Sequence, residues 1–281
     1  MIHLSMLWPE GREKALTLSY DDAVLQDIRL LEIMNANGIK GTFNLNSGYL
    51  GGEGHLIREG HYVQHNKVAP EKVASVYAGH EVAVHTVTHP NLCNLPDAQV
   101  LDEVLTDRRN LEALVGYPVR GMAYPSGRVD QRVIDLMKGC GIVFARGVDT
   151  TKKFSIPPKD TWLNWECSCH HWELEPLIDP FLHGKGLKLL SVWGHAYEFD
   201  QRDDWEVIED QLGRLGGHED VWYATNIEVF DYIAAFHSLD VAVDGSSAYN
   251  RSSANVWVSV KGQKYEIPAG KVVRFEERSM K

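Results

Sequence analysis

Leu16-Thr17-Leu18-Ser19-Tyr20-Asp21-Asp22 is a short apolar run that stops at two adjacent carboxylates. Short runs rich in apolar and β-branched residues are typical of buried strands. Six further runs of this kind follow along the chain. We therefore expect seven buried strands, within residues 15–20, 41–45, 81–84, 121–124, 141–145, 187–193 and 221–225.

The segments between these runs carry apolar residues at three- and four-residue spacing, which predicts amphipathic helices. Leu25, Ile28 and Leu31 show this spacing before Gly38, and a second such segment follows Pro96. Alternating strands and helices predict an α/β fold of about seven parallel strands covered by helices. Of the open doubly wound sheet and the closed barrel, we favour a distorted (β/α) barrel, in which chemistry gathers at the C-terminal ends of the strands.

The pattern changes after His237 to alternating, turn-linked segments typical of β structure. The clearest are residues 256–260 and 264–267, joined by a Lys261-Gly262 turn. About 40 residues are too few for an independent domain. We therefore divide the chain into a barrel of residues 1–237 and a small β-rich C-terminal appendage of residues 238–281. The appendage either covers an edge of the barrel or binds carbohydrate.

The composition of the chain limits the classes of partner that it is expected to bind. The 281 residues carry a net charge of −11, from 39 acidic and 28 basic residues, which argues against nucleic acid and anionic membrane surfaces. The sequence has neither a signal-like start nor an apolar run of about 20 residues, so we expect a cytoplasmic protein. Four cysteines at irregular spacing predict reduced thiols. The run from Cys167 to His171 lacks the second ligand pair that a structural zinc site needs, so a packed loop is the alternative.

Two histidines and two carboxylates follow predicted strands. Asp21 and Asp22 end the first strand, where two charges are costly without a partner, although a helix N-cap is the alternative. His85 and His89 follow the third strand four residues apart, which would place both on one face of a helical turn. Two imidazoles and one carboxylate leave a tetrahedral zinc an open position, as in catalytic sites. His195 ends a later strand and is expected beside them.

These motifs resemble, in order, those of the polysaccharide deacetylase superfamily, also called the NodB-homology or carbohydrate esterase family 4 fold. Residues 19–23 are similar to the Thr-Phe-Asp-Asp-Gly motif, which implies that Asp21 is the catalytic base and Asp22 a metal ligand. Residues 85–90 match the His-Ser/Thr-x-x-His-Pro motif, which implies that His85 and His89 complete the ligand set. The run ending at His195 implies that this histidine is the catalytic acid.

The third motif of the family, Arg-Pro-Pro-Tyr-Gly, corresponds to residues 123–127, so alanine occupies the arginine position. Arg120 is our candidate to restore the positive charge near Asp21. The resemblance implies an oxyanion donor from this loop, most simply the Ser126 N–H, beside Tyr124 and Pro125 in the pocket. The fourth motif is not cleanly present, and Asp149, Asp160, Trp162 and Trp165 are candidates without a decision among them. The aromatic residues of this segment, Trp165 among them, either shape the substrate pocket or anchor the loop in the core.

The resemblance implies a metal-dependent hydrolase that removes acetyl groups from N-acetylated amino sugars or oligosaccharides. Zinc suits the expected ligands, with cobalt, nickel or manganese as alternatives. An O-acetyl carbohydrate esterase remains open, because Ala196 stands where the family commonly has an aspartate after the acid. A C–N hydrolase of a non-sugar amide also remains open, because the resemblance implies a fold that hosts such members. A non-catalytic sugar-binding barrel is the alternative outside enzymes.

Overall fold

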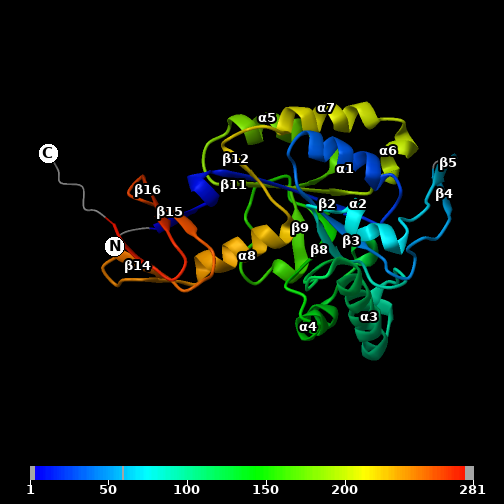
Figure 1. The fold of residues 1–281 in the computed structure, drawn as a ribbon, viewed down its shortest axis with the longest axis horizontal. Helices are drawn as coiled ribbons and strands as arrows, with labels where there is room; N and C mark the ends of the chain where they lie inside the picture. The colour runs from blue at the N-terminus through cyan, green and yellow to red at the C-terminus, as the bar shows by residue number, and fades with distance from the viewer. Residues whose placement is uncertain (1–3, 59, 276–281) are drawn as a thin grey trace.

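The computed structural model describes residues 4–58 and 60–275. A parallel sheet forms its centre, and within the described residues this sheet has nine strands (Figure 1). Their order is β10-β11-β2-β3-β6-β7-β8-β9, and β12 also pairs with β2. The strands are β2 (Lys14–Asp21), β3 (Gly41–Leu45), β6 (Glu81–Val84), β7 (Gly121–Ala123), β8 (Phe144–Thr150), β9 (Trp165–Cys167), β10 (Cys169–His170), β11 (Lys188–Gly194) and β12 (Val221–Tyr223).

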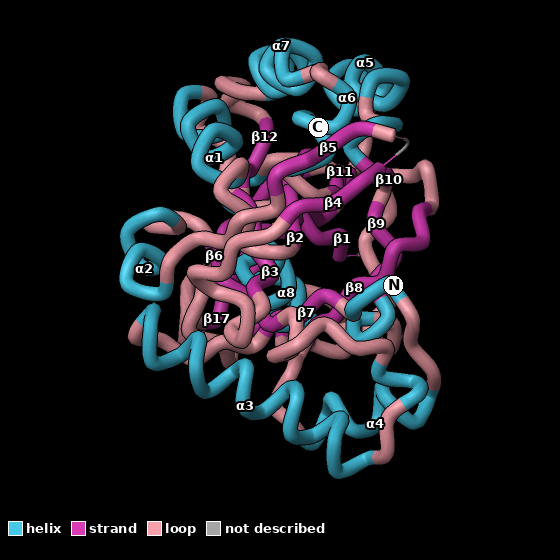
Figure 2. The backbone as a smooth tube through the Cα atoms, turned by 90° about the vertical axis from the view of Figure 1, so that its right-hand side faces the viewer, coloured by secondary structure: helices cyan, strands magenta, loops and turns pink. Residues whose placement is uncertain are grey.

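Helices surround this sheet (Figure 2). In Figure 1, α1, α5 and α7 lie above the strands, and α3 and α4 lie below them. The α-helices of the described residues are α1 (Asp27–Ala36), α2 (Val73–Val76), α3 (Asp97–Val115), α4 (Gln131–Gly139), α5 (Glu175–His183), α6 (Tyr197–Arg202), α7 (Trp205–Leu215) and α8 (Asn226–His237). The α/β class expected from the sequence is therefore confirmed.

All seven strands predicted for the central sheet are present. Two further short strands of this sheet were not predicted. β3 and β6 have the expected bounds, whereas β8 begins at Phe144 rather than at Gly141. Gly141 instead follows the end of α4 with a φ of 70°, a left-handed conformation that glycine adopts without strain. The missed strands β9 and β10 lie in the long segment after β8, and neither is long enough to show a sequence pattern.

Ser168 connects the two ends of the sheet. It is the only residue between β9, which pairs with β8, and β10, which pairs with β11. The Ser168 N–H donates to the Ser191 carbonyl on β11 at 2.8 Å, and the Ser191 N–H donates to Ser168 Oγ at 3.1 Å. The first and last strands of the sheet order are thus consecutive in the chain, and the sheet curves back towards itself.

The strands outside the main sheet form three small antiparallel sheets. β1 (Leu4–Leu7) pairs with β15 (Val256–Val260), so the first described strand joins the C-terminal β structure. Lys261 and Gly262, with φ of 52° and 79°, form the expected turn between β15 and β16. The division of the chain at residue 237 stays a prediction. The remaining strands are β16 (Gln263–Ile267), β13 (Leu239–Val241), β14 (Ser247–Asn250) and β17 (Val272–Arg274), and a separate hairpin of β4 (His55–Arg58) and β5 (His61–Gln64).

No helix among the described residues combines the length and the apolar character needed to cross a bilayer.

Glu81, at the start of β6, links three elements through buried hydrogen bonds. Thr42 Oγ1 on β3 donates to Glu81 Oε2 at 2.7 Å, and the Ile227 N–H in the first turn of α8 donates to the same oxygen at 2.9 Å. Burial raises the pKa of Glu81 from 4.5 to about 8. Between these two values the folded chain holds a proton on Glu81 that the unfolded chain has lost.

The free energy of unfolding should therefore fall as the pH rises from about 4.5 to about 8. One such group contributes a slope of at most about 1.4 kcal/mol per pH unit. We expect Glu81→Gln, which cannot ionise, to flatten this slope in urea denaturation series. The exposed Glu32→Gln variant is the control and should keep the native slope. An unchanged slope in Glu81→Gln would show that Glu81 is already ionised in the folded state.

Candidate metal centre and active site

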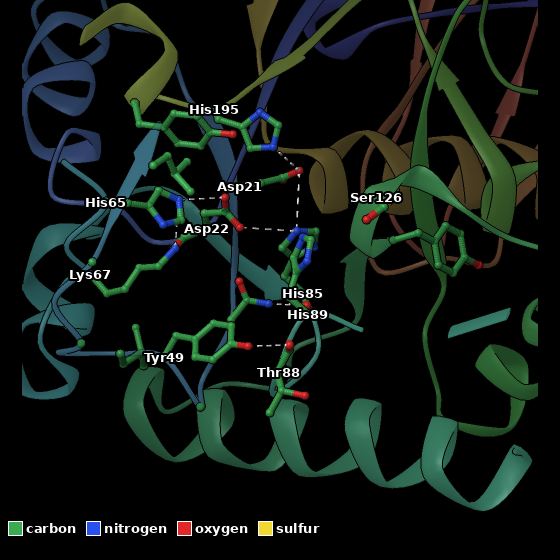
Figure 3. Close-up of a pocket in the computed structure, with 18 of the residues that line it drawn as sticks. Asp21, Asp22, Tyr49, His65, Lys67, His85, Thr88, His89, Ser126 and His195 are labelled. Atoms are coloured by element: carbon green, nitrogen blue, oxygen red, sulfur yellow. Dashed lines mark hydrogen bonds and ion pairs between the residues drawn. The ribbon is translucent and has the colours of Figure 1, made fainter. Parts of the chain in front are cut away.

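A cavity of about 710 Å³ opens at the C-terminal ends of the parallel strands (Figure 3). Asp21 and Asp22 reach it from the end of β2, and His85 and His195 follow the ends of β6 and β11. The sequence predicted this convergence, because parallel strands present their carboxyl ends at one edge. The other lining residues considered below are Asn46, Tyr49, Leu56, Arg58, His65, Lys67, His89, Tyr124, Ser126, Val148 and Tyr197.

Asp22, His85 and His89 form a trio that can hold a metal ion. One possible ligand atom from each lies within 4.8 Å of the other two. His85 Nδ1 donates to the Ala123 carbonyl at 2.8 Å, which leaves Nε2 unprotonated and 3.8 Å from Asp22 Oδ1. Nε2 is buried and has no hydrogen-bond partner among the described residues. Burial lowers the pKa of His85 to about 4, so the imidazole is neutral, as a metal ligand must be. The trio thus fits a divalent metal.

The two histidines are not on a helical turn, contrary to our expectation. Residues 85–90 form a loop in which Thr86 and His89 have φ of 68° and 56°. Thr86 Oγ1 accepts a hydrogen bond from the His89 N–H at 3.1 Å, and the two imidazole rings lie 4.8 Å apart. The two imidazoles therefore come together because Thr86 and His89 have left-handed backbone conformations, and not because the histidines lie on a helix.

Asp22 is held from its outer side by His65 and Lys67. His65 Nε2 lies 3.3 Å from Asp22 Oδ2, and Lys67 Nζ donates to the Asp22 carbonyl at 2.7 Å (Figure 3). Burial alone would raise the pKa of Asp22, but these neighbours, with His195 and His85, hold it well below its usual value. Asp22 is therefore ionised, and its Oδ1 faces His85.

Arg146 holds Asp21 in its ionised form. This arginine lies on β8, is fully buried, and donates from Nη2 to Asp21 Oδ1, to which Asn44 Nδ2 also donates at 2.9 Å. Burial alone would raise the pKa of Asp21, but the charge of Arg146, followed by electrostatic interactions with His85 and His195, lowers it. Arg146 Nε also donates to Ser19 Oγ at 2.9 Å, which fixes the guanidinium between β8 and β2.

Arg120 does not reach Asp21, so that expectation was wrong. It forms a half-exposed ion pair with Asp231 on α8, with an Nη2–Oδ2 distance of 2.6 Å. The positive charge missing at Ala123 on β7 is instead supplied by Arg146 from the adjacent strand. A single arginine directly after an apolar predicted strand was the signal for it, since a buried charge requires a partner.

His195 lies on the other side of Asp21 from the metal trio. Its Nε2 is 3.9 Å from Asp21 Oδ2, and its Nδ1 is 3.4 Å from Glu198 Oε2. Burial alone would lower the pKa of His195, but Glu198 and both aspartates raise it to about 9. Glu198, in the first turn of α6, thus provides the carboxylate that is missing at Ala196. We did not identify Glu198 from the sequence.

Of the four predicted pocket residues, two line the cavity and two do not. Ser126, with a φ of 59°, and Tyr124 line the cavity, although the Tyr124 hydroxyl turns away and donates to the Leu163 carbonyl at 2.7 Å. Pro125 is buried and is not among the lining residues. Trp165 is also buried and packs against Trp162 with ring centroids 5.3 Å apart, outside this cavity. Trp162 and Trp165 therefore anchor this segment in the core.

The sequence analysis also missed the wall of the cavity built by residues 46–58 and 65–67. Tyr49 donates from its hydroxyl to the Thr88 carbonyl at 2.7 Å, and Leu56 and Arg58 line the cavity from β4. These residues occupy loops and a hairpin without a periodic pattern, so the sequence carries no signal for their placement.

The fold and the site define an α/β protein that presents an Asp-His-His trio and an arginine-paired aspartate at the ends of parallel strands. The polysaccharide deacetylase family model matches residues 9–145. The chain is 28% identical over 132 residues to a chitooligosaccharide deacetylase of Bradyrhizobium, covering 47% of this chain and 50% of that protein. It is 24% identical over 145 residues to an uncharacterized Bacillus subtilis protein, YlxY, covering 48% and 40%. The chain thus spans half or less of the length of these relatives.

Two solved structures have a similar fold. A Mycobacterium smegmatis protein described as a polysaccharide deacetylase has a TM-score of 0.57 at 16% identity, covering 84% of this chain and 96% of that one. The carbohydrate esterase 4 domain of a xylanase from the hindgut metagenome of Trinervitermes trinervoides has a TM-score of 0.50 at 15% identity, covering 79% and 92%. The polysaccharide deacetylase family match over residues 9–145 agrees with the resemblance that the motifs suggested.

Ala23, where the family has glycine, has a φ of 54°. This left-handed conformation costs a residue with a Cβ roughly 1–2 kcal/mol. Glycine avoids this cost, but the greater conformational entropy of its unfolded chain offsets part of the gain. We expect Ala23→Gly to raise the free energy of unfolding by up to about 1 kcal/mol. Ala15→Gly, inside β2, is the matched control and should lower it. A loss in Ala23→Gly as large as in the control would contradict this explanation.

Removing Arg146 should leave Asp21 buried without a counter-charge. We expect Arg146→Ala to lower the free energy of unfolding by about 3–5 kcal/mol. Arg120→Ala, which breaks only the half-exposed pair with Asp231, should lose at most about 1 kcal/mol. Chemical denaturation of both variants tests the contrast, and equal losses would mean that the buried pair contributes no more than the surface pair.

Proposed function

We propose that this chain is a metal-dependent hydrolase that removes acetyl groups from N-acetylated amino sugars or short oligosaccharides. The observation that carries the proposal is the position of Asp21, whose Oδ2 lies 3.9 Å from both His85 Nε2 and His195 Nε2. Asp21 thus stands between the metal trio and the expected acid. The proposal includes a distorted barrel, with Asp22, His85 and His89 as metal ligands and zinc as the metal.

Each chemical role has a residue suited to it. A divalent metal held by the trio would polarise the acetyl carbonyl and make water a stronger nucleophile at neutral pH. Asp21, kept ionised by Arg146, accepts the proton of the attacking water. His195, whose positive charge Glu198 stabilises, donates a proton to the departing nitrogen. The Ser126 N–H is the proposed backbone donor to the oxyanion.

The environment of His195 favours an amide substrate over an ester. An amine leaves only after its nitrogen is protonated, whereas an alkoxide leaves more readily, so amide hydrolysis depends more strongly on the acid. Glu198 Oε2 accepts a hydrogen bond from the His195 N–H at 3.0 Å and lies 3.4 Å from Nδ1, which supports the protonated imidazole. The carboxylate that the sequence lacked at Ala196 is thus replaced.

A carbohydrate fits the shape and lining of the cavity. Its volume of about 710 Å³ lies within the range of roughly 300–1,000 Å³ usual for small-molecule pockets. The aromatic residues Tyr49 and Tyr197 line the cavity, and Arg58 lines it from β4. The deacetylase named among the relatives acts on a chitooligosaccharide, which supports an acetylated amino sugar as substrate.

Acetate release from a panel of N-acetylated sugars, O-acetylated sugars and non-sugar acetamides, with metal-stripped protein and added zinc, tests the proposal. We expect zinc-dependent release from amides. Release from esters alone would support the esterase, release only from non-sugar amides would support a C–N hydrolase, and no release would support a sugar-binding barrel.

Asp21→Asn separates catalysis from metal binding. We expect kcat to fall by about 10²–10⁴-fold, the usual contribution of a general base, because an amide cannot accept the proton. Zinc content should remain unchanged, since the proposed ligands are intact. Urea denaturation must accompany the assay, because Arg146 loses its charged partner. Full activity in a folded Asp21→Asn variant would exclude Asp21 as the base.

A further inference from the structure

A second cluster of possible metal ligands lies outside the trio. His170 ends β10, His171 begins the short 3₁₀ helix η6 (His171–Glu173), and Glu198 lies in the first turn of α6. Each offers one ligand atom within 4.8 Å of the other two. The backbone changes from strand to 3₁₀ helix between the histidines, so neighbouring side chains reach the same point. The proposed reaction uses Glu198 only through His195 and uses neither histidine.

The spacing of these atoms suits a small divalent cation. Glu198 Oε2 lies 3.1 Å from His170 Nε2 and 3.5 Å from His171 Nε2. Zinc binds imidazole nitrogen and carboxylate oxygen at about 2.0–2.2 Å, so tetrahedral ligands stand roughly 3.3–3.6 Å apart. The two separations are close to this range. Small shifts of the side chains would bring them to a common centre.

His171 has no hydrogen-bond partner that explains its burial. The residue is 2% exposed, and neither ring nitrogen makes a hydrogen bond within the described residues. The ring stacks between Tyr20 and Phe199, with centroid distances of 5.8 and 4.4 Å, so it cannot easily turn towards water. An unpaired buried nitrogen is costly, and buried polar groups nearly always have partners. A cation at Nε2 would satisfy this lone pair.

Glu198 is not a hydrogen-bond partner of His171. Glu198 Oε2 accepts the His195 N–H at 3.0 Å and lies 3.1 Å from His170 Nε2. His171 Nε2, at 3.5 Å from the same oxygen, makes no hydrogen bond. The Trp172 N–H donates to His170 Nδ1 at 3.3 Å, so the His170 proton is on Nε2. Cation binding would move that proton to Nδ1 and break this long hydrogen bond, which makes the site weaker than a preformed one.

We infer that His170, His171 and Glu198 form a second divalent-cation site beside the proposed active site. The cation would be one that accepts two imidazoles and a carboxylate, such as zinc, with its remaining positions open. Entry is past His170, whose side chain is 12% exposed, next to Trp172 and the Arg202 side chain stacked on it. The charge of Arg202 opposes cation binding. We therefore expect this site to fill after the trio.

Because Glu198 Oε2 also faces His195 Nδ1, a cation at this site would compete with His195 for the carboxylate. Excess metal would then change the environment of the proposed acid without displacing any ligand of the trio. The inference concerns binding and does not depend on the substrate.

Zinc binding by metal-stripped protein, measured by isothermal titration calorimetry and by metal analysis after gel filtration, tests the inference. The native chain should bind two zinc ions, the second more weakly. Asp22→Ala/His89→Ala should bind one, and adding His171→Phe should remove it. Phenylalanine keeps the stacking with Tyr20 and Phe199, and circular dichroism checks the fold.

His171→Phe alone should still bind one zinc ion. His170→Gln is a second, independent variant that should also lose the weaker ion, and the exposed His61→Gln is the control that should keep both. A native chain that binds a single zinc ion would overturn the second site. Zinc binding in Asp22→Ala/His89→Ala that survives both His171→Phe and His170→Gln would also overturn it.

Discussion

The buried ion pair between Arg146 and Asp21 is the interaction on which the geometry of the site depends. Both side chains are almost completely buried, so each charge is stable there only because of the other. Arg146 also donates to Ser19 Oγ, and its guanidinium lies 5.1 Å from the centre of the Trp193 ring. The pair therefore connects β8, β2 and β11 across the interior of the curved sheet. Without it, burial would raise the pKa of Asp21 and disfavour the ionised form that accepts a proton from water.

Around this pair, the turns that follow the strands direct side chains into the cavity. Asp22 after β2, Thr86 and His89 after β6, and Ser126 after β7 all have positive φ, between 56° and 85°. Such conformations are costly for residues with a Cβ and persist where the surrounding structure enforces them. Here the enforcing elements are fixed, hydrogen-bonded parallel strands. These four strained residues thus lie at the ends of the strands that surround the cavity.

Much of this arrangement could be predicted from the sequence. Seven strands were found because each lies in a buried apolar run, and parallel pairing then brought Asp21, Asp22, His85 and His195 to one edge. What could not be predicted depends on contacts between distant segments. β9 and β10 are too short for a pattern, and Trp165 could equally face a pocket or the core until its neighbours Trp162 and Phe144 were known.

The sequence also could not predict which side chains would pair with the charged residues. Arg120 and Arg146 are both arginines near predicted strand ends, and only the pairing of β8 with β7 distinguishes them. Glu198 follows His195 by three residues, but one turn of α6 is needed to bring its carboxylate back towards the imidazole. The sequence identified the groups that bear the chemistry, whereas the tertiary structure determined which charges stabilise them.

Anomalous X-ray diffraction at the zinc edge, from crystals of metal-stripped protein given one equivalent of zinc, tests the central claim most directly. The account predicts the strongest anomalous peak between Asp22, His85 and His89, with bonds of about 2.0–2.2 Å to two imidazole nitrogens and one carboxylate oxygen. A strongest peak elsewhere, or none in the cavity that Asp21 lines, would contradict the proposed metal centre and the mechanism built on it.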